Sequence, residues 1–333
     1  MTESFEHRHA AHCETGVMSA MLRYHGLDIS EPMAFGLASG LTYAYIPLVK
    51  INGLPLIAYR TPPRMIIRAL SRRIGGLTMN FKKFRKPEEG EQALNRLLDE
   101  GKVVGLQTSV FFLPYFPEDM RFHFNAHNLL VYGREETQYQ VSDPVFSHVV
   151  TVDGESLSKA RFAKGALAPK GLIYYPTSVP AEIDFDTVLP KSIRFTAKIN
   201  GPKSPVPIAG AKGIQRVARH IRKLADADER HAHLYLGHIV RMQEEIGTGG
   251  GGFRFMYAAF LQEAAGIMSS DLLSEAADEM SSIGDEWRLF ALMCARKSKA
   301  RYDDTFDSIA DQLEKIAQRE AALFTRLSAF RSV

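Results

Sequence analysis

The chain has 333 residues, 45% of them hydrophobic and 24% charged, and a formal net charge of +3 at pH 7. This is the composition of a globular protein long enough to bury a sizeable core in about two domains, and it excludes general disorder. Two cysteines, 281 positions apart, exclude a disulfide framework and favour a reducing compartment, while the small net charge does not by itself indicate nucleic-acid binding.

The N-terminal segment MTESFEHRHAAHCETG is polar and carries charges of both signs. It lacks the apolar core of a secretory signal, and no stretch approaches the roughly 18 uninterrupted apolar residues of a membrane span. We therefore expect a cytoplasmic protein that has no membrane partner.

Short helices and one hairpin are expected in the first hundred residues. Apolar residues at helical spacing, with glycines after them as stop signals, predict the helices. Ser30 followed by Pro32 is typical of a helix start, and Asn52-Gly53 between two apolar runs predicts a β-hairpin. The expected helices cover residues 14–25, 63–73 and 88–100, with a short one after Ser30.

Five β-type runs with short connections follow. Short connections favour antiparallel pairing. Because helices come first and strands later, we expect an α+β domain with an antiparallel sheet and not a doubly wound one. The runs cover residues 103–110, 127–133, 138–143, 148–152 and 171–175.

The sequence pattern changes near residue 200. Six prolines between residues 176 and 207 make that stretch poor material for a regular element. Beyond it the periodicity predicts an all-α helical domain. We expect domains at residues 1–200 and 201–333, the second with helices at 212–225, 229–246, 253–267, 269–297 and 303–331.

Cys13 stands at the predicted start of the first helix. A helix N-terminus presents unpaired N–H groups and a partial positive charge, and both favour the reactive thiolate over the thiol. The same N–H groups can hold the oxyanion that forms when a thiolate attacks a carbonyl. An inert buried cysteine is the alternative, and the polar residues before Cys13 argue against it.

A thiol nucleophile needs a base, and His127 opens the β-type run HNLLVYG. Asp143 ends the neighbouring run QYQVSD, so antiparallel pairing brings the two side chains together. Asp143 would then orient the imidazole and leave its second nitrogen for the thiol. The alternatives are an ordinary strand histidine and a turn aspartate before Pro144.

The order Cys–His–Asp and the strings HCETG, HNLLVYG and QVSDP resemble papain-like cysteine enzymes of the bacteriocin-leader peptidase type. Two further strings, FGLASGLTYAY at residues 35–45 and GTGGGGFRFMYAAFLQEAA at residues 247–265, resemble recurring segments of the butirosin biosynthesis protein H family. The resemblance implies a papain-like cysteine-enzyme domain followed by a helical domain. It also implies acyl transfer from a carrier-protein thioester, through the cysteine, to an amine.

By this resemblance, Cys13 is the nucleophile, His127 the base and Asp143 the residue that orients it. Papain-like peptidases usually have a glutamine shortly before the cysteine that donates to the oxyanion, and His7 occupies that position here. An imidazole N–H of His7 would donate instead. His12, directly before the cysteine, either assists or is polar surface.

The N-terminal histidines raise a rival interpretation. His7, His9, His12 and Cys13 form the string H-x-H-x-x-H-C, all of zinc-ligand types. A polar terminus with several histidines is commonly nothing more, and no second Cys/His cluster follows. We expect no metal and no cofactor, the phosphopantetheine arm of a carrier protein serving only to carry the substrate.

The run GTGGGG at residues 247–252 precedes the predicted helix FRFMYAAFLQEAA. It lacks the Gly-Lys-Ser/Thr of a P-loop and no strand leads into it, so a nucleotide fold is unsupported. It is either a flexible loop or a wall of the acyl pocket. In the second case Gly250, Arg254 and Tyr257 would contact the substrate or a pantetheine phosphate.

Residues 60–86 carry nine Lys and Arg and no Asp or Glu. Arg64, Arg68 and Arg72 repeat every four residues and so share a helix face. This face is either solvated or a dock for an acidic acyl carrier protein, whose encounter charge steering would speed. Nucleic acid is disfavoured because residues 201–333 carry 18 Lys and Arg against 18 Asp and Glu.

Together these observations favour a cysteine-dependent acyltransferase of secondary-metabolite biosynthesis, with an acyl carrier protein and a small amine as partners. A hydrolase with the same triad is the alternative, because the choice of acceptor depends on how dry the pocket is. A binding protein with an inert Cys13 is a third hypothesis. The acyl group, the acceptor and a homo-oligomeric state remain open.

Overall fold

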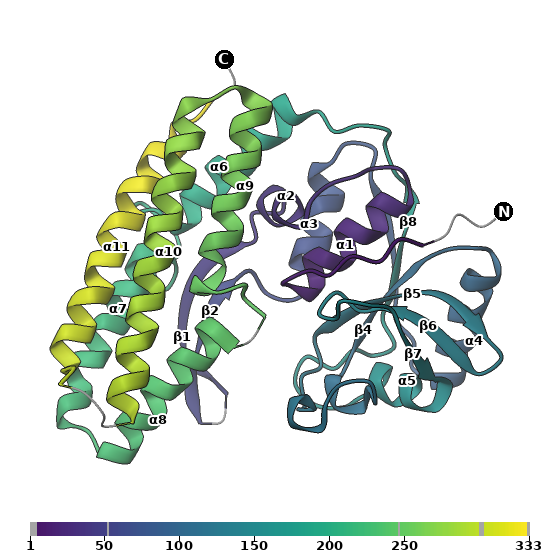
Figure 1. Ribbon diagram of the computed structural model, residues 1–333, viewed down its shortest axis with the longest axis horizontal. Coiled ribbons are helices and arrows are strands. Elements are labelled where there is room, and N and C mark those ends of the chain that lie inside the picture. The colour runs from purple at the N-terminus through teal and green to yellow at the C-terminus, as the bar shows by residue number, and fades with distance from the viewer. Residues whose placement is uncertain (1–4, 52, 246, 300–302, 332–333) are drawn as a thin grey trace. The chain divides into compact units, whose positions relative to one another are not determined.

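A computed structural model of the chain describes residues 5–51, 53–245, 247–299 and 303–331. These residues form two units, whose elements are labelled in Figure 1. The first unit is built from described residues within 1–34 and 66–183, and the second from those within 35–65 and 184–333. The chain therefore visits the second unit twice.

The first unit contains a six-stranded antiparallel sheet with the order β3-β8-β4-β5-β6-β7. The central strand β4 and the first half of β5 are buried at every position, so both faces of the sheet are covered there. The strands are β3 (Thr78–Lys82), β4 (Val104–Thr108), β5 (His127–Glu135), β6 (Gln138–Ser142), β7 (Val150–Asp153) and β8 (Ile173–Ser178).

Helices cover this sheet. The helices α4 (Pro87–Asp99) and α5 (Gly154–Arg161) share a hydrophobic core with Leu129 and Val131 of β5. Side chains alternate between the faces of a strand, so Asn128 and Leu130 face the other side. The helix α1 (Cys13–Tyr24), buried from its first residue to Leu22, packs against β5 and β4. The unit also holds two short 3-10 turns, Val110–Phe112 and Glu118–Met120.

Two further helices contain the points where the chain passes between units. They are α2 (Glu31–Leu37) and α3 (Met65–Arg73).

The second unit combines a β-hairpin with helices. The strands β1 (Leu41–Ile51) and β2 (Leu54–Arg60) pair antiparallel and pack against α6, α7 and α8. In the same unit α10 lies beside both α9 and α11 (Figure 1). The helices are α6 (Phe185–Asn200), α7 (Gly210–Lys223), α8 (Glu229–Val240), α9 (Arg254–Met268), α10 (Asp271–Ser298) and α11 (Phe306–Ser328). Short turns cover Leu224–Asp226 and Gly251–Phe253, and a π-helical turn covers Arg241–Glu245.

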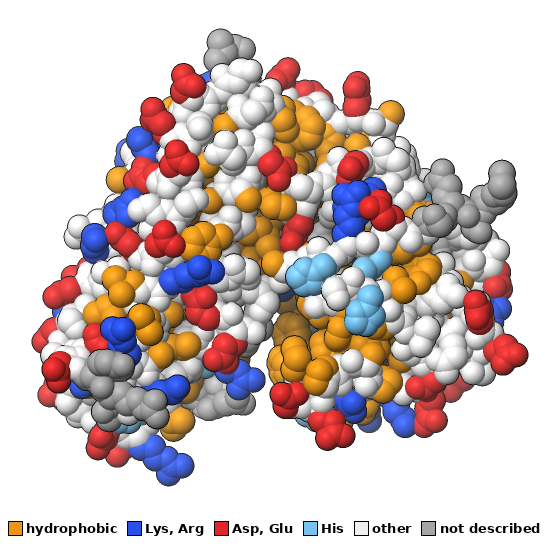
Figure 2. All heavy atoms as spheres, viewed as in Figure 1, with side chains coloured by type: hydrophobic (Ala, Val, Ile, Leu, Met, Phe, Trp, Pro, Cys, Tyr) orange, Lys and Arg blue, Asp and Glu red, His pale blue; other side chains and the backbone are white. Residues whose placement is uncertain are grey.

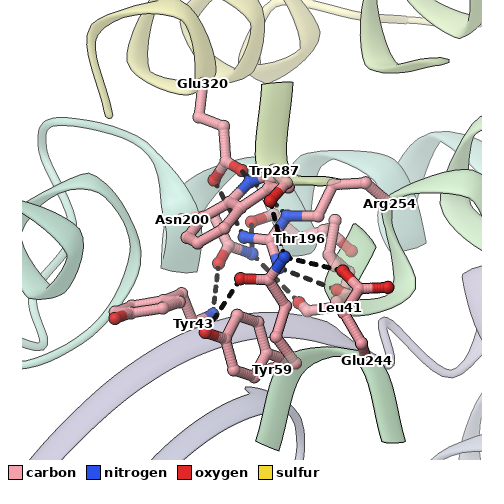
Figure 3. A network of polar contacts seen from close by, with 11 residues as sticks. Leu41, Tyr43, Tyr59, Thr196, Asn200, Glu244, Arg254, Trp287 and Glu320 are labelled. Carbon is pink, nitrogen blue, oxygen red and sulfur yellow. Dashed lines mark hydrogen bonds and ion pairs between the residues drawn. The ribbon is translucent and has the colours of Figure 1, made fainter. Parts of the chain in front are cut away.

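A buried polar network ties these helices together (Figure 3). The Arg254 guanidinium of α9 donates from Nε and Nη2 to the two carboxylate oxygens of Glu320 on α11, at 2.8 and 3.1 Å. The indole N–H of Trp287 on α10 donates to the same carboxylate at 2.7 Å. All three side chains are fully buried, and each charge has a partner, as burial requires.

The predicted α+β class, an antiparallel sheet with helices followed by a largely helical region, is confirmed. The expected β-hairpin is also present, although Asn52 at its tip lies outside the described residues. The proline-bearing stretch was expected to lack regular structure, and this prediction was wrong for residues 185–200, which form α6 with Pro190 inside it. Burial of Val188, Leu189 and Ile193 on one face stabilises that helix despite the proline.

The expected division of the chain at residue 200 differs from the observed units. Residues 35–65 belong with the helical unit because the β1–β2 hairpin packs on α6 and α7, and residues 184–200 belong there as α6. Within the described residues, no helix combines the length and the apolar character that a membrane crossing requires.

Candidate active site

Cys13 is the first residue of α1, where its sulfur meets the positive end of the helix. His12 ends the extended backbone before it, and its Nδ1 accepts a hydrogen bond from the Thr15 N–H at 3.4 Å. In the described part of the chain, no hydrogen-bond acceptor takes the Cys13 N–H. This N–H is therefore available to a negatively charged oxygen that forms next to the sulfur.

The backbone before Cys13 is held by Glu31, the first residue of α2. Its carboxylate accepts hydrogen bonds from the N–H groups of Ala11 at 2.9 Å and His12 at 2.7 Å, and from the Thr15 hydroxyl at 3.0 Å. Burial raises the pKa of Glu31, while these donors act in the opposite direction. No local sequence signal marks Glu31, because its partners lie 16 to 20 positions away along the chain.

His127 and Asp143 meet as antiparallel pairing predicts. His127 opens β5 and Asp143 directly follows β6, and the pairing of Leu130 with Ser142 sets the register. The His127 Nε2 lies 2.6 Å from Asp143 Oδ2, and both side chains are buried. The Tyr115 hydroxyl donates to the same carboxylate oxygen at 2.9 Å, a contact that the sequence analysis missed.

The charge on His127 is set by its two neighbours. Burial lowers the pKa of the imidazole, but the charge and hydrogen bond of Asp143 and the hydrogen bond of Cys13 outweigh it and raise this pKa to about 10. Since Asp143 occupies Nε2, the other ring nitrogen, Nδ1, is the one left for Cys13. The raised pKa favours the imidazolium form of His127 at neutral pH.

A second side chain reaches the sulfur. The amide Nδ2 of Asn128 lies 4.0 Å from Cys13 Sγ, with both residues buried. An asparagine that follows a strand histidine carries no distinguishing signal in the sequence, so the sequence analysis did not include it. The site around the sulfur thus holds the start of α1, the imidazole of His127 and the amide of Asn128.

The segment after β4 carries apolar side chains, one of which contacts His127. Phe116 contacts the His127 ring edge-to-face, with ring centroids 5.5 Å apart. The same segment exposes Phe111, Met120 and Phe122. Figure 2 shows apolar side chains gathered beside histidines on one face of this unit. The segment that contacts the His127 ring thus also presents exposed apolar surface.

His7 does not occupy the position expected of an oxyanion donor. Its Nδ1 lies 2.7 Å from the Ser142 hydroxyl and its Nε2 lies 2.9 Å from the Phe146 carbonyl. A carbonyl only accepts, so Nε2 carries the proton and Nδ1 accepts from the serine. This leaves no N–H of His7 for a substrate, and the residue instead fixes the N-terminal segment to the end of β6.

His12 is a buried N-cap of α1 and not polar surface. In the described residues, no group of three or more His, Cys, Asp or Glu side chains is arranged to hold a metal ion. His7 and His12 both make contacts within the local structure around the start of α1 and the end of β6.

The residues expected at the glycine-rich loop lie in the second unit, and Arg254 has a structural role there. Its guanidinium is fully buried and donates to Glu320 and, from Nη1, to the Gly252 carbonyl at 2.8 Å (Figure 3). It therefore presents no charge to a substrate phosphate. Tyr257 is also fully buried, in contact with the rings of Phe260 and Phe324.

The loop itself holds a carboxylate of the chain. The backbone N–H of Gly251 donates to both oxygens of Glu244, at 3.1 and 3.2 Å, and that of Gly250 donates to the Thr248 hydroxyl. Gly249 to Gly252 all have positive φ, between 56° and 84°, which explains the run of glycines. The loop is shaped by internal contacts, and these two N–H groups are not left for a phosphate.

Only two of the three arginines of the predicted basic face lie on a helix. Arg68 and Arg72 are exposed on α3, with the Arg68 guanidinium 5.3 Å from the centre of the Phe81 ring. Arg64 precedes the helix with a φ of 72°, so the helical spacing does not extend to it. The N-terminus of α3 is capped by Glu14, which accepts from the N–H groups of Ile66 and Ile67 at 3.1 and 3.4 Å.

Comparison with known proteins identifies two family models. Residues 12–144 match the model described as butirosin biosynthesis protein H, N-terminal, and residues 155–327 match a domain of unknown function, DUF4872. No curated protein matches the chain. Among solved structures, the chain is similar to one described as a C39-like peptidase from Bacillus anthracis, with 15% identity and a TM-score of 0.36 over 52% of this chain and 94% of the peptidase.

Proposed function

Because the chain belongs to the butirosin biosynthesis protein H family and carries a DUF4872 domain over residues 155–327, we propose that it is a cysteine-dependent acyltransferase. The acyl group comes from the phosphopantetheine thioester of a carrier protein and passes through Cys13 to a small amine in a biosynthetic route. One observation carries the proposal. Cys13 stands at the start of α1 and interacts electrostatically with His127, whose Nε2 is held by Asp143.

The first half-reaction forms the acyl-enzyme. The Cys13 thiolate attacks the thioester carbonyl, and the Cys13 N–H at the start of α1 stabilises the oxyanion. When this intermediate collapses, the carbon–sulfur bond to the carrier breaks. The leaving pantetheine thiolate takes the proton of the His127 imidazolium, so the carrier departs as a thiol.

The second half-reaction releases the product. The amine attacks the acyl-enzyme, and neutral His127 takes the proton that the nitrogen loses. Cys13 then leaves as a thiolate, which restores the initial thiolate–imidazolium pair. The net change is a thioester and an amine converted to an amide and a thiol, with Asp143 keeping the imidazole in one orientation throughout.

Acylation by an S-acyl-N-acetylcysteamine thioester, a small mimic of the pantetheine arm, tests the nucleophile. Intact-protein mass spectrometry is expected to detect one acyl adduct on the unmodified chain and none on Cys13→Ala. Cys294→Ala is the matched control and should retain the adduct, because Cys294 is fully buried in α10 and burial raises its pKa. An adduct that persists in Cys13→Ala refutes the assignment.

A hydrolase with the same three residues, an amidase, thioesterase or peptidase, differs only in the acceptor. Product analysis of the acylated enzyme with and without a panel of primary amines separates the two. Amide formation that outcompetes loss of the acyl group to water supports the transferase. Release of the free acid at an equal rate with every amine supports the hydrolase.

We further propose that Arg68 and Arg72 receive an acidic carrier protein. Glu14 supports this, because it caps the helix that bears them and directly follows the nucleophile. Reversing both charges (R68E/R72E) is expected to lower kcat/KM for an acylated carrier protein by about tenfold or more, with a strong dependence on salt. The N-acetylcysteamine thioester should react at an unchanged rate, and an equal loss with both substrates contradicts docking.

A further inference from the structure

The side-chain amide of Asn128 has three contacts within the first unit. Its Oδ1 accepts from the Tyr174 hydroxyl at 3.0 Å, and its Nδ2 donates to the Ala126 carbonyl at 3.1 Å. The same Nδ2 lies 4.0 Å from Cys13 Sγ. Since an amide nitrogen carries two hydrogens, one N–H serves the carbonyl and the other is left for the sulfur.

Two partners fix which way this amide points. The Ala126 carbonyl only accepts, so a flipped amide would set two carbonyl-type oxygens against each other. The Tyr174 hydroxyl donates to Oδ1, and burial raises its pKa well above the usual value, so it keeps its proton. Nδ2 is therefore the atom that faces the cysteine.

Tyr174 is in turn held by the sheet. It pairs with Gly105 of β4, and a Cβ atom at residue 105 would lie 2.1 Å from the tyrosine ring. Only glycine at residue 105 leaves room for the Tyr174 ring. With the ring in this place, the Tyr174 hydroxyl reaches the side chain of Asn128. Tyr174 and Asn128 are both almost fully buried, so water does not replace either contact.

An N–H donor acts differently on the two forms of a thiol. A hydrogen bond to neutral sulfur is weak, whereas a bond to an ionised group is shorter and about twice as strong as a neutral one. Donation by Asn128 therefore lowers the free energy of the thiolate more than that of the thiol. It acts alongside the imidazolium of His127 and the N-terminus of α1.

From these contacts we infer that Asn128 is a further catalytic residue, whose amide donates a hydrogen bond to the Cys13 thiolate, and that Tyr174 is the positioning residue that orients this amide. The inference rests on the proposed function, in which the thiolate is the nucleophile. Asn128 would stabilise the Cys13 thiolate when it attacks the thioester and again when it leaves the acyl-enzyme.

The test is the pH dependence of alkylation by iodoacetamide, read on the Cys13 peptide by mass spectrometry. Asn128→Leu has nearly the same shape and no donor, and it should raise the midpoint of alkylation by about one pH unit. Tyr174→Phe removes one hydroxyl and should shift the midpoint in the same direction by less. The matched controls are Asn80→Leu and Tyr175→Phe, an Asn–Tyr pair on the same sheet whose hydrogen bond is exposed, and they should leave the midpoint unchanged.

The outcomes separate this inference from the proposed function. A low midpoint in the unmodified chain that does not move in Asn128→Leu or Tyr174→Phe overturns the inference and leaves the nucleophile in place. A midpoint near the free-thiol value of about 8.5 in the unmodified chain overturns both. If Asn128→Leu does not fold, as judged by circular dichroism, the midpoint of alkylation in Tyr174→Phe decides, because this variant lacks only a single hydroxyl.

Discussion

The Nε2 atom of His127 lies 2.6 Å from Oδ2 of Asp143, and the two side chains are 5% and 0% exposed. A hydrogen bond of this length, shielded from water, fixes both the tautomer and the orientation of the imidazole. The nitrogen that faces Cys13 is consequently determined by a residue that does not itself touch the sulfur.

Replacing Asp143 with asparagine should therefore slow acylation without removing the nucleophile. The amide keeps the shape but lacks the charge that holds the imidazolium, and the rate of acyl-enzyme formation should fall by about 10²–10⁴-fold. Single-turnover acylation with an N-acetylcysteamine thioester measures it. Asp153→Asn is the control, because Asp153 only caps α5. An equal loss in both variants would point to damaged folding.

The same pair predicts a pH-dependent stability. Folding raises the pKa of His127 to about 10, from about 6.5 in an unfolded chain. Such a group stabilises the folded state fully below the unfolded pKa, and this contribution disappears as the pH rises through the folded pKa. The free energy of unfolding of the unmodified chain should exceed that of Asp143→Asn by more at about pH 6 than at about pH 10. Urea unfolding at the two pH values tests this, and an excess that grows toward high pH contradicts it.

Glu320 is predicted to be the most sensitive charged residue of the second unit. Glu320→Ala leaves the guanidinium of Arg254 buried without its partner, at a cost of about 3–5 kcal/mol in the free energy of unfolding. Asp311→Ala on the exposed side of the same helix removes one partner of Arg222 and should change stability little. Chemical denaturation of both variants compares them, and equal losses would mean that burial is not the cause.

Gly252 is predicted to be irreplaceable in the glycine-rich loop. Its φ is 56°, and an added Cβ would lie 2.3 Å from the Tyr59 ring. Backbone strain and overpacking together should cost Gly252→Ala at least about 2 kcal/mol. Gly266→Ala, in an open position of α9, should instead stabilise the chain by up to about 1 kcal/mol. The midpoint of thermal unfolding should fall in Gly252→Ala and rise in Gly266→Ala. An unchanged midpoint in Gly252→Ala would show that the loop adapts to the added methyl group.

The sequence by itself determined most of the helices and strands, the antiparallel pairing of β5 with β6, and the placement of Cys13, His127 and Asp143 at the ends of their elements, but it did not indicate β3, α5 or α6. These features depend on side-chain periodicity and on short connections, which act between residues close along the chain. The meeting of His127 with Asp143 follows in the same way, since one tight turn joins β5 to β6.

Only the tertiary structure decided which polar groups are satisfied by the protein. His7 bonds a serine 135 positions away, Arg254 a glutamate 66 positions away, and Asn128 a tyrosine 46 positions away. No local pattern encodes such partners, because they are selected by which elements pack together. Burial then requires each polar group to have a partner. Arg254 consequently forms a structural ion pair with Glu320, and Asn128 is held next to the sulfur of Cys13.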